Sequence, residues 1–230
     1  IENNTLLRSS QIIEELIAPE NICVLSGPSH AEEIAKKLPA SVVAASKDIE
    51  YAEMVQREFG SGRLRIYSET DVVGVEISGA LKNVIAIAAG ICDGLGLGDN
   101  AKAALVTRGI VEMARLGVKL GADPSTFYGL SGIGDLITTC YSGFGRNRSV
   151  GMRIGKGEGI EEILKDMDQV AEGVWTVKSV IPLAKKLSVS MPISFQIYDI
   201  LFKGLDPREA VRSLMMRDFR KEKEDWTGNA

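Results

Sequence analysis

The sequence predicts an α/β fold, in which a partial doubly wound (Rossmann-type) sheet is followed by an all-α helical domain. Residues 1–70 alternate short β-forming runs with segments of helical spacing, the order typical of strands covered by helices. From residue 71 the strand pattern stops, and helical segments bounded by Gly, Pro or Ser follow one another. We therefore expect the carboxyl-terminal half of a dinucleotide-binding domain at 1–70 and a helical substrate and catalytic domain at 71–218.

The first part contains three predicted strands, NICVLS (21–26), PASVVAAS (39–46) and RLRIYS (63–68). Helical segments separate them, which favours parallel pairing through crossover helices. A doubly wound sheet normally begins with a strand and a Gly-rich turn, and neither stands before the first of these runs. We therefore expect that the amino-terminal part of this domain is missing from the chain.

The second part begins with a predicted helix at 71–94, followed by one that ends at a cap residue, Gly121. Pro182 lies inside a later helical segment and is expected to kink or break it. The charged end, 219–230, is expected to fray. The remaining predicted helices cover residues 134–142, 159–167, 174–187, 193–202 and 207–216.

Composition excludes several classes of function. A net charge of -4 and a pI near 5.3 argue against a nucleic-acid-binding surface. The chain has one histidine and three widely spaced cysteines without a C-x-x-C pair, which argues against a zinc site or a disulfide framework and favours the cytoplasm. No signal peptide is visible, and the apolar run Ile77–Cys92 is short for a membrane span.

Lys82 is the only charged residue within the apolar run Ile77–Cys92. On a helix its neighbours would be small, which leaves room for a ligand or for a closely packed helix. Burial lowers the pKa of a lysine and makes it usable as a general acid or base. Alternatively, the side chain snorkels to the surface from a half-buried helix. Both interpretations remain open from the residues alone. The small neighbours are Ser78, Gly79, Ala86, Ala89 and Gly90.

Two further segments could bind an anion. In SGPSHAEEIA (26–35) a strand end meets a helix start, whose free amides favour an anion; a capping box of Ser29 and Glu32 would satisfy the same amides. GFGRNRSVGMRIGKG (143–157) is the strongest local basic feature. Its arginines suit bidentate phosphate binding, and a solvated surface loop explains them equally well.

Three more polar residues have simple structural explanations. Asp135 and Glu172 stand where helices are predicted to begin, so the helix dipole accounts for both. Thr139 follows Asp135 by one turn on the same face. The glycines of DGLGLGD (93–99) follow a helix and lack the G-x-G-x-x-G spacing, which predicts a helix stop and a tight turn rather than a nucleotide loop.

The order of these motifs closely resembles the NAD(P)-dependent glycerol-3-phosphate dehydrogenase family in its bacterial form. The motifs are SGPSHAEE, the segment 71–109, GLSGIGDL-x-x-TC, RNR-x-VG and EGV-x-T, and the resemblance runs from residue 1 to about 218. It implies an oxidoreductase that interconverts dihydroxyacetone phosphate and sn-glycerol 3-phosphate with NAD or NADP as cofactor. This reaction feeds phospholipid synthesis.

The resemblance also implies roles for individual residues. Lys82 would donate the proton to the ketone during reduction, and Asp135 would help to position lysine and substrate. Arg146 and Asn147 would grip the phosphate, with Arg146 also near the cofactor. The remaining implied contacts are Gly27, Ser29, Asn83 and Thr139 with the substrate, and Ala31, Val170 and Glu172 with the cofactor.

Two departures from the family pattern affect these expectations. A second lysine expected just before Ile1 is absent together with the Gly-rich half, so the chain alone is expected to lack hydride-transfer activity. The residue that selects NADH or NADPH belongs to that half as well. Gly145 stands where many relatives have Ser, which removes a side-chain hydrogen bond to the phosphate.

Two other functions stay open. A β-hydroxyacid or sugar-acid dehydrogenase of the same architecture would bind a carboxylate; the arginines at 146–148 and the SGPSHA motif argue against it. A helical dimerisation module would use the small face around Lys82 as its seam. The predicted partner is a small-molecule substrate, with neither nucleic acid, metal nor a membrane span, and a homodimer is left open.

Overall fold

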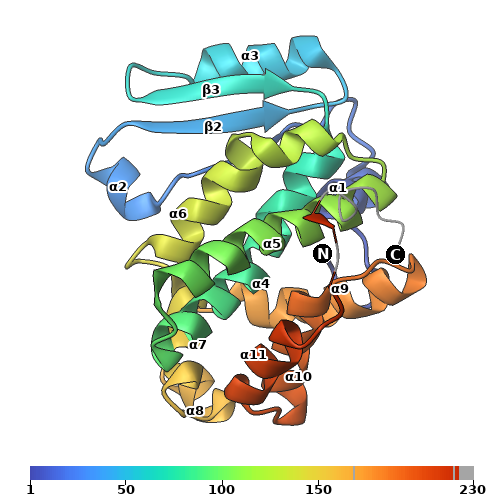
Figure 1. Ribbon diagram of the computed structural model, residues 1–230. Coiled ribbons are helices and arrows are strands. Elements are labelled where there is room, and N and C mark those ends of the chain that lie inside the picture. The colour runs from blue at the N-terminus through green and yellow to red at the C-terminus, as the bar shows by residue number, and fades with distance from the viewer. Residues whose placement is uncertain (168, 220, 223–230) are drawn as a thin grey trace.

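A computed structural model describes residues 1–167, 169–219 and 221–222 (Figure 1). A three-stranded sheet carries helices on both faces, and within the described residues everything after it is helical or irregular, which confirms the predicted fold class. Most of the predicted frayed end, 219–230, lies outside the described residues. The first elements are α1 (Ser9–Ile17), β1 (Val24–Ser26), α2 (Ala31–Ala35), β2 (Ala40–Ala45), α3 (Ile49–Phe59) and β3 (Leu64–Glu69).

The strand order is β1-β2-β3, and the strands are not uniformly parallel. Strands β2 and β3 are parallel, with Val42 opposite Ile66, as the long intervening helix α3 requires. Strand β1 is antiparallel to β2, so the expectation of parallel pairing was wrong there. Helix α2 has only five residues and is too short to carry the chain back along the sheet, so β2 returns beside β1 in the opposite direction.

The two faces of the sheet bury different partners, because successive residues of a strand point to opposite sides. Val42 and Ala44 pack with Val55 of α3 on one face. Val43 and Ala45 pack on the other face against Val72 and Val75, which belong to the first turn of the next helix. The sheet is therefore fastened directly to the helix that carries Lys82.

The helical part follows as α4 (Val72–Leu95), α5 (Gly98–Lys119), a 3₁₀ turn (Pro124–Tyr128), a π turn (Leu130–Gly134), α6 (Asp135–Tyr141), α7 (Arg146–Gly155), α8 (Ile160–Lys165), α9 (Glu172–Lys186), α10 (Pro192–Lys203) and α11 (Pro207–Met215). The surface-loop interpretation of the basic segment 143–157 is wrong, because that segment is helix α7 for most of its length, with Val150 and Ile154 burying an apolar face. Pro182 does not break its helix: it lies inside a continuous α9, where burial of Val177, Val180 and Ile181 outweighs the lost hydrogen bond.

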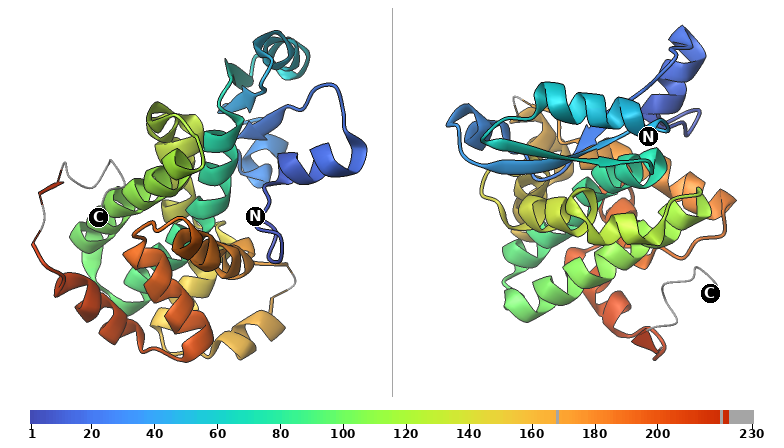
Figure 2. Two further views of the ribbon diagram at one scale, coloured as in Figure 1. Left: turned by 90° about the vertical axis from the view of Figure 1, so that its right-hand side faces the viewer. Right: turned by 90° about the horizontal axis from the view of Figure 1, so that it is seen from above.

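Helix α4 is the centre of the molecule. It descends from the sheet into the other helices, which surround it (Figures 1 and 2). Among the described residues it is the one helix long and apolar enough to match a membrane span, and 72% of that stretch is buried inside the protein. Such burial is characteristic of the core helix of a globular fold.

Helices α4 and α7 approach so closely that their backbones touch. A Cβ on Gly151 would stand 1.9 Å from the carbonyl oxygen of Ile87, and one on Gly90 would stand 2.0 Å from that of Arg148. Neither position has room for a side chain. The small face predicted for α4 is thus used, over this length, for close helix packing. We call these two glycines, together with Gly94 and Gly155, the glycine seam.

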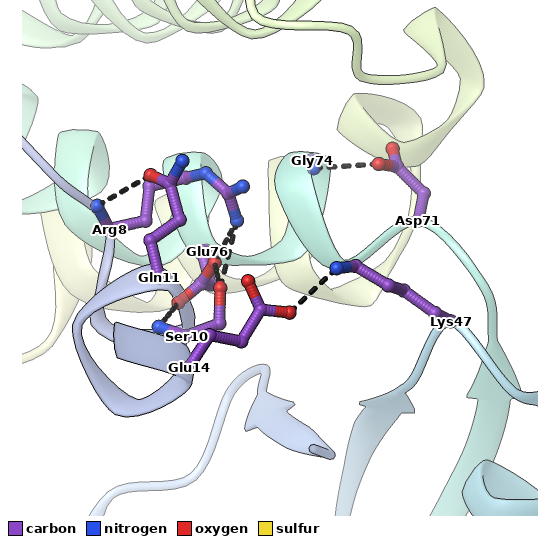
Figure 3. A network of polar contacts seen from close by, with 8 residues as sticks. All are labelled: Arg8, Ser10, Gln11, Glu14, Lys47, Asp71, Gly74 and Glu76. Carbon is purple, nitrogen blue, oxygen red and sulfur yellow. Dashed lines mark hydrogen bonds and ion pairs between the residues drawn. The ribbon is translucent and has the colours of Figure 1, made fainter. Parts of the chain in front are cut away.

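Helix α1 is held against α4 by Glu76 (Figure 3). The Glu76 carboxylate accepts hydrogen bonds from the backbone N–H of Ser10, at 2.7 Å, and from its hydroxyl, and it also pairs with Arg8. Lys47 pairs with Glu14 at 2.6 Å and ties the same helix to the loop after β2. These contacts join the amino-terminal segment to both the sheet and the central helix.

Helix α10 is capped by a side chain from another helix. Its own cap residue, Met191, offers no side-chain hydrogen bond. Glu112 of α5 supplies it, accepting from the backbone N–H of Ile193 at 2.6 Å and from the N–H and hydroxyl of Ser194. Burial raises the pKa of Glu112 to about 7, and the hydrogen bonds from Ile193 and Ser194 offset only part of that rise.

Substituting Gly151→Ala is expected to destabilise the fold by about 2–3 kcal/mol, because the new methyl group must displace the backbone of α4. Gly62→Ala is the matched control, since a Cβ there meets nothing within 4 Å; we expect its free energy of unfolding within about 0.5 kcal/mol of wild type. Urea unfolding measures both. Equal stabilities for the two variants would contradict the close approach.

Glu112 predicts a pH dependence of stability. A pKa raised from 4.5 to about 7 means that the folded state keeps a proton that the unfolded state has lost. The contribution of Glu112 to the free energy of unfolding is therefore greatest below pH 4.5. This contribution, roughly 3 kcal/mol, is lost as the pH rises through 7. Glu112→Gln should remove this fall in urea unfolding between pH 5 and 8, whereas the exposed Glu161→Gln should retain it. An unchanged slope in Glu112→Gln would contradict the prediction.

Candidate active site

Lys82 and Asp135 form the centre of the candidate site. Lys82 Nζ, from the middle of α4, donates to Asp135 Oδ2 at 2.5 Å, and Asp135 is the first residue of α6. The two side chains are 21% and 4% exposed. A charge in a largely apolar helix requires such a partner. Because an ammonium has three donors, two remain for a ligand after Asp135 has taken one.

The position of Asp135 follows from the turn that precedes it. The π turn Leu130–Gly134 reverses the chain through Gly132, which is non-helical at φ -89°, ψ -105°. Phe127, fully buried just before, packs so tightly that a Cβ on Gly132 would stand 2.2 Å from its carbonyl oxygen. Thr139 then donates its hydroxyl to the carbonyl oxygen of Asp135 at 2.6 Å and lies 3.4 Å from its Oδ1. Helix α6 thus presents a fixed carboxylate to Lys82.

A chain of buried amides lies beside this pair. Asn147 Nδ2 donates to Asn83 Oδ1 at 2.9 Å, and the backbone N–H of Gly173 donates to Asn147 Oδ1 at 2.9 Å. Asn147 therefore links the first turn of α7 to both α4 and the start of α9. Asn83 Nδ2 lies 3.4 Å from the carbonyl oxygen of Gly79 and 3.5 Å from Glu172 Oε2, so its donors point to protein groups. A primary amide offers two donors, so Asn147 Nδ2 retains one for a ligand after its hydrogen bond to Asn83.

Arg146, Val170 and Glu172 form the outer edge of the site. The Arg146 guanidinium donates to the carbonyl oxygen of Val170 at 3.3 Å and lies 3.9 Å from Glu172 Oε1. The side chains of Arg146 and Glu172 are 45% and 59% exposed, so both remain open to a ligand. Helix α7 begins at Arg146 without a side-chain cap, which leaves its first backbone N–H groups available to an anion.

The β1–α2 turn also approaches the site, since its Ser26 end lies beside Gly79 of α4 and its His30 end contacts Phe144. Gly27 has φ +143°, and a Cβ there would stand 2.9 Å from Val42 Cα, so only glycine fits. The predicted capping box is wrong: His30 is the cap residue of α2, and the Ser29 hydroxyl donates instead to the carbonyl oxygen of Gly27 at 2.9 Å. The His30 ring packs edge-on against Phe144, so the residue before α2 contacts the turn that precedes Arg146.

Sequence reasoning missed two contributions at this edge. Ser26, the last residue of β1, approaches α4 one turn before Lys82, where a Cβ on Gly79 would stand 3.1 Å from its hydroxyl oxygen. Ser78 is fully buried on the same helix, and its hydroxyl has no partner. The signal was present in the small residues around Lys82, which admit a neighbouring strand as well as a ligand.

A cavity lined mainly by apolar side chains lies elsewhere in the protein. It has a volume of about 570 Å³ and lies among α4, α5, α10 and α11. The candidate residues do not line it. We therefore locate the site from the polar groups that converge on Lys82, since these groups rather than an apolar cavity offer chemistry. Among the described residues no group of three metal-ligating His, Cys, Asp or Glu side chains comes together.

Comparison with known proteins finds one family over nearly all of the chain. A family model described as "NAD-dependent glycerol-3-phosphate dehydrogenase C-terminus" matches residues 71–212, and the corresponding "N-terminus" model matches residues 1–52. Among curated relatives, glycerol-3-phosphate dehydrogenase [NAD(P)+] of Staphylococcus aureus (strain JH9) is 52% identical over 225 residues, covering 96% of this chain and 68% of that protein. The protein of the same description from Listeria monocytogenes serotype 4b is 54% identical over 229 residues, covering 98% and 68%.

Solved structures give the same result. The glycerol-3-phosphate dehydrogenase of Coxiella burnetii superposes with a TM-score of 0.90 at 38% identity, covering 93% of this chain and 66% of that chain. The glycerol-3-phosphate dehydrogenase of Saccharomyces cerevisiae superposes with a TM-score of 0.80 at 29% identity, covering 91% and 63%. The present chain thus spans about two thirds of the length of these proteins.

Asn147→Asp is expected to destabilise the protein by about 1–3 kcal/mol, because a carboxylate has no N–H to donate to Asn83 Oδ1 and would face that oxygen while buried. Asn100→Asp, at an exposed position near the start of α5, is the control and should leave the free energy of unfolding nearly unchanged. Urea unfolding compares the two. An unchanged free energy of unfolding in Asn147→Asp would mean that the buried amide chain does not stabilise the site.

Proposed function

Because this chain belongs to the NAD-dependent glycerol-3-phosphate dehydrogenase family, we propose that it carries the substrate side of an NAD(P)-dependent interconversion of dihydroxyacetone phosphate and sn-glycerol 3-phosphate. The observation that carries the proposal is the Lys82–Asp135 ion pair, set beside the amide chain of Asn83 and Asn147. The site thus combines a proton donor with a separate group of neutral and cationic hydrogen-bond donors, as the reduction of a phosphorylated ketone requires.

Lys82 is proposed to manage the proton. Reduction of a ketone builds negative charge on its oxygen, and an ammonium within hydrogen-bond reach stabilises that charge and then transfers its proton to the oxygen. In the oxidation direction, the neutral amine accepts the proton from the alcohol. Asp135 keeps the lysine side chain aimed, and the Thr139 hydroxyl, bonded to the carbonyl oxygen of Asp135 at 2.6 Å, steadies the first turn of α6.

Arg146 and Asn147 are proposed to hold the phosphate. A guanidinium supplies paired donors for phosphate oxygens, and the uncapped amides at the start of α7 add further donors. Gly145 supplies no hydroxyl at that start. Holding the phosphate here fixes the distance between the ketone carbon and the reducing group. Gly27, Ser29, Asn83 and Thr139 are the remaining proposed substrate contacts.

The cofactor edge is proposed to consist of Ala31, Arg146, Val170 and Glu172. The half-exposed guanidinium and carboxylate of Arg146 and Glu172 fit the amide and phosphate groups of a dinucleotide, since they offer charged donors and acceptors that neighbouring residues leave accessible. When bound, NAD(P)H supplies the two electrons and the hydrogen that reduce the ketone carbon. The chain's own contribution at this edge is to bind and orient.

The hydroxyacid-dehydrogenase alternative is not favoured, because both matched family models and the curated relatives describe glycerol-3-phosphate dehydrogenases. The proposal places the protein in the cytoplasm, where its three free cysteines would remain reduced. Its partner is the small-molecule substrate. A homodimer is the assembly to test, by sedimentation.

Lys82→Ala is expected to lower the turnover of dihydroxyacetone phosphate by roughly 10²–10⁴, the usual contribution of a general acid. NADH and NADPH oxidation are measured in the protein at the full length of its relatives, since the present chain covers 68% of them. The turnover of Lys82→Arg should fall by a similar factor, because a guanidinium keeps the charge but does not release its proton.

Lys119→Ala, an exposed lysine in the last turn of α5, is the matched control and should retain wild-type turnover. Activity within a few-fold of wild type in Lys82→Ala would remove the proton-donor role. Turnover of β-hydroxyacids without turnover of dihydroxyacetone phosphate would overturn the proposed function.

A further inference from the structure

Asp93, in the last turn of α4, forms ion pairs with two cationic side chains from different helices. Its Oδ2 accepts from Arg148 Nε of α7 at 2.7 Å, and both of its carboxylate oxygens accept from Lys102 Nζ of α5, at 3.0 and 2.9 Å. The Lys102 side chain is 7% exposed, and those of Asp93 and Arg148 are 23% and 22% exposed. Such partly buried, charge-assisted hydrogen bonds are stronger and geometrically more demanding than surface ion pairs.

Both cationic side chains also contact the end of α6 and the residue after it. Lys102 Nζ lies 4.4 Å from the centre of the Tyr141 ring, and the Arg148 guanidinium donates to the carbonyl oxygen of Ser142 at 3.2 Å. Tyr141 stands immediately before the turn 142–145, Ser142 is its first residue, and Arg148 lies in the first turn of α7, which follows it. Asp93 therefore fixes the chain on both sides of this turn through the two side chains that it pairs.

The turn 142–145 joins the two halves of the substrate site. Asp135 and Thr139 precede it on α6, and Arg146 and Asn147 follow it on α7. Apart from the edge-on contact between Phe144 and His30, the turn has little packing of its own, since a Cβ on Gly143 would meet nothing within 4 Å and Phe144 is 53% exposed. Its position, and with it that of the phosphate-binding residues, depends on how its ends are held.

Asp93 cannot act by touching the substrate. It follows Lys82 by eleven residues along α4, which at 1.5 Å per residue is about 16 Å. The glycine seam holds α4 against α7 independently of the ion pairs. Loss of the Asp93 carboxylate would therefore free the turn to shift while the helices stay packed. Lys102 and Arg148 would then face each other as like charges without the anion that separates them.

We propose that Asp93 is a positioning residue for the phosphate of the substrate: through Lys102 and Arg148 it sets the turn 142–145, and thereby the distance from Arg146 and Asn147 to Lys82. The inference rests on the proposed function and adds to it a residue remote from the reacting atoms. Its consequence is specific to the phosphate end of the substrate, because Lys82 and Asp135 are held by other contacts.

The test compares a phosphorylated and an unphosphorylated ketone in the full-length protein. In Asp93→Asn, we expect the KM for dihydroxyacetone phosphate to rise about 10–100-fold, the range for a weakened hydrogen bond to a charged group, with kcat within about threefold. The kcat/KM for dihydroxyacetone, which has no phosphate, should stay within about twofold. Asp93→Glu, which keeps the charge, should recover most of the lost affinity.

Asp199→Asn is the matched control, because Asp199 also pairs with a lysine, Lys203 at 2.7 Å, on a helix away from the turn; both substrates should be unaffected. Arg148→Lys is the second variant, since it replaces the two separate nitrogens that contact Asp93 and the Ser142 carbonyl oxygen by a single one. It should show the same phosphate-specific rise in KM if Asp93→Asn fails to fold.

An unchanged KM for dihydroxyacetone phosphate in Asp93→Asn and Arg148→Lys would overturn the inference. An equal loss of kcat/KM for both ketones would overturn it as well, because it would show a general structural role. A wild-type protein that turns over neither ketone would overturn the proposed function itself, a result distinct from both.

Discussion

The candidate site depends on one constraint: the ammonium of Lys82 lies in a helix that is buried almost throughout, so it must be met by a carboxylate. Asp135 can pair with Lys82 only if α6 begins beside the middle of α4. The π turn at 130–134 and the buried Phe127 fix where α6 begins. The sheet contributes by packing Val43 and Ala45 on the first turn of the same helix. The fold is therefore arranged around the position of a single charged group.

Close helix packing completes the site. The backbones of α4 and α7 touch at Gly90 and Gly151, and this contact brings Asn147 within hydrogen-bond distance of Asn83. A wider seam would separate the amide chain from the Lys82 ion pair. Asp93 then holds the turn that leads into α7 from the far end of the same helix. One long helix thus positions Lys82, the amide chain and the turn 142–145 relative to one another.

Local patterns in the sequence predicted the fold class, the long central helix and the helix end at the glycines of 93–99, because periodicity and turn chemistry are encoded by neighbouring residues. They also singled out Lys82 from its isolation in an apolar run. Contacts between residues far apart in the sequence could not be predicted from local patterns. The antiparallel β1, the helical α7 and the cross-helix cap supplied by Glu112 each depend on a partner far along the chain, and the capping box at Ser29 lost to a hydrogen bond with Gly27.

The most direct test of the account is a crystal structure of the full-length protein with dihydroxyacetone phosphate bound. The account predicts the ketone oxygen at about 2.7–3.1 Å from Lys82 Nζ, with the phosphate oxygens against Arg146, Asn147 and the first amides of α7. The opposite orientation, with the phosphate on Lys82 and the ketone oxygen near Arg146, would contradict it, because Lys82 would then be an anchor for the substrate rather than its proton donor.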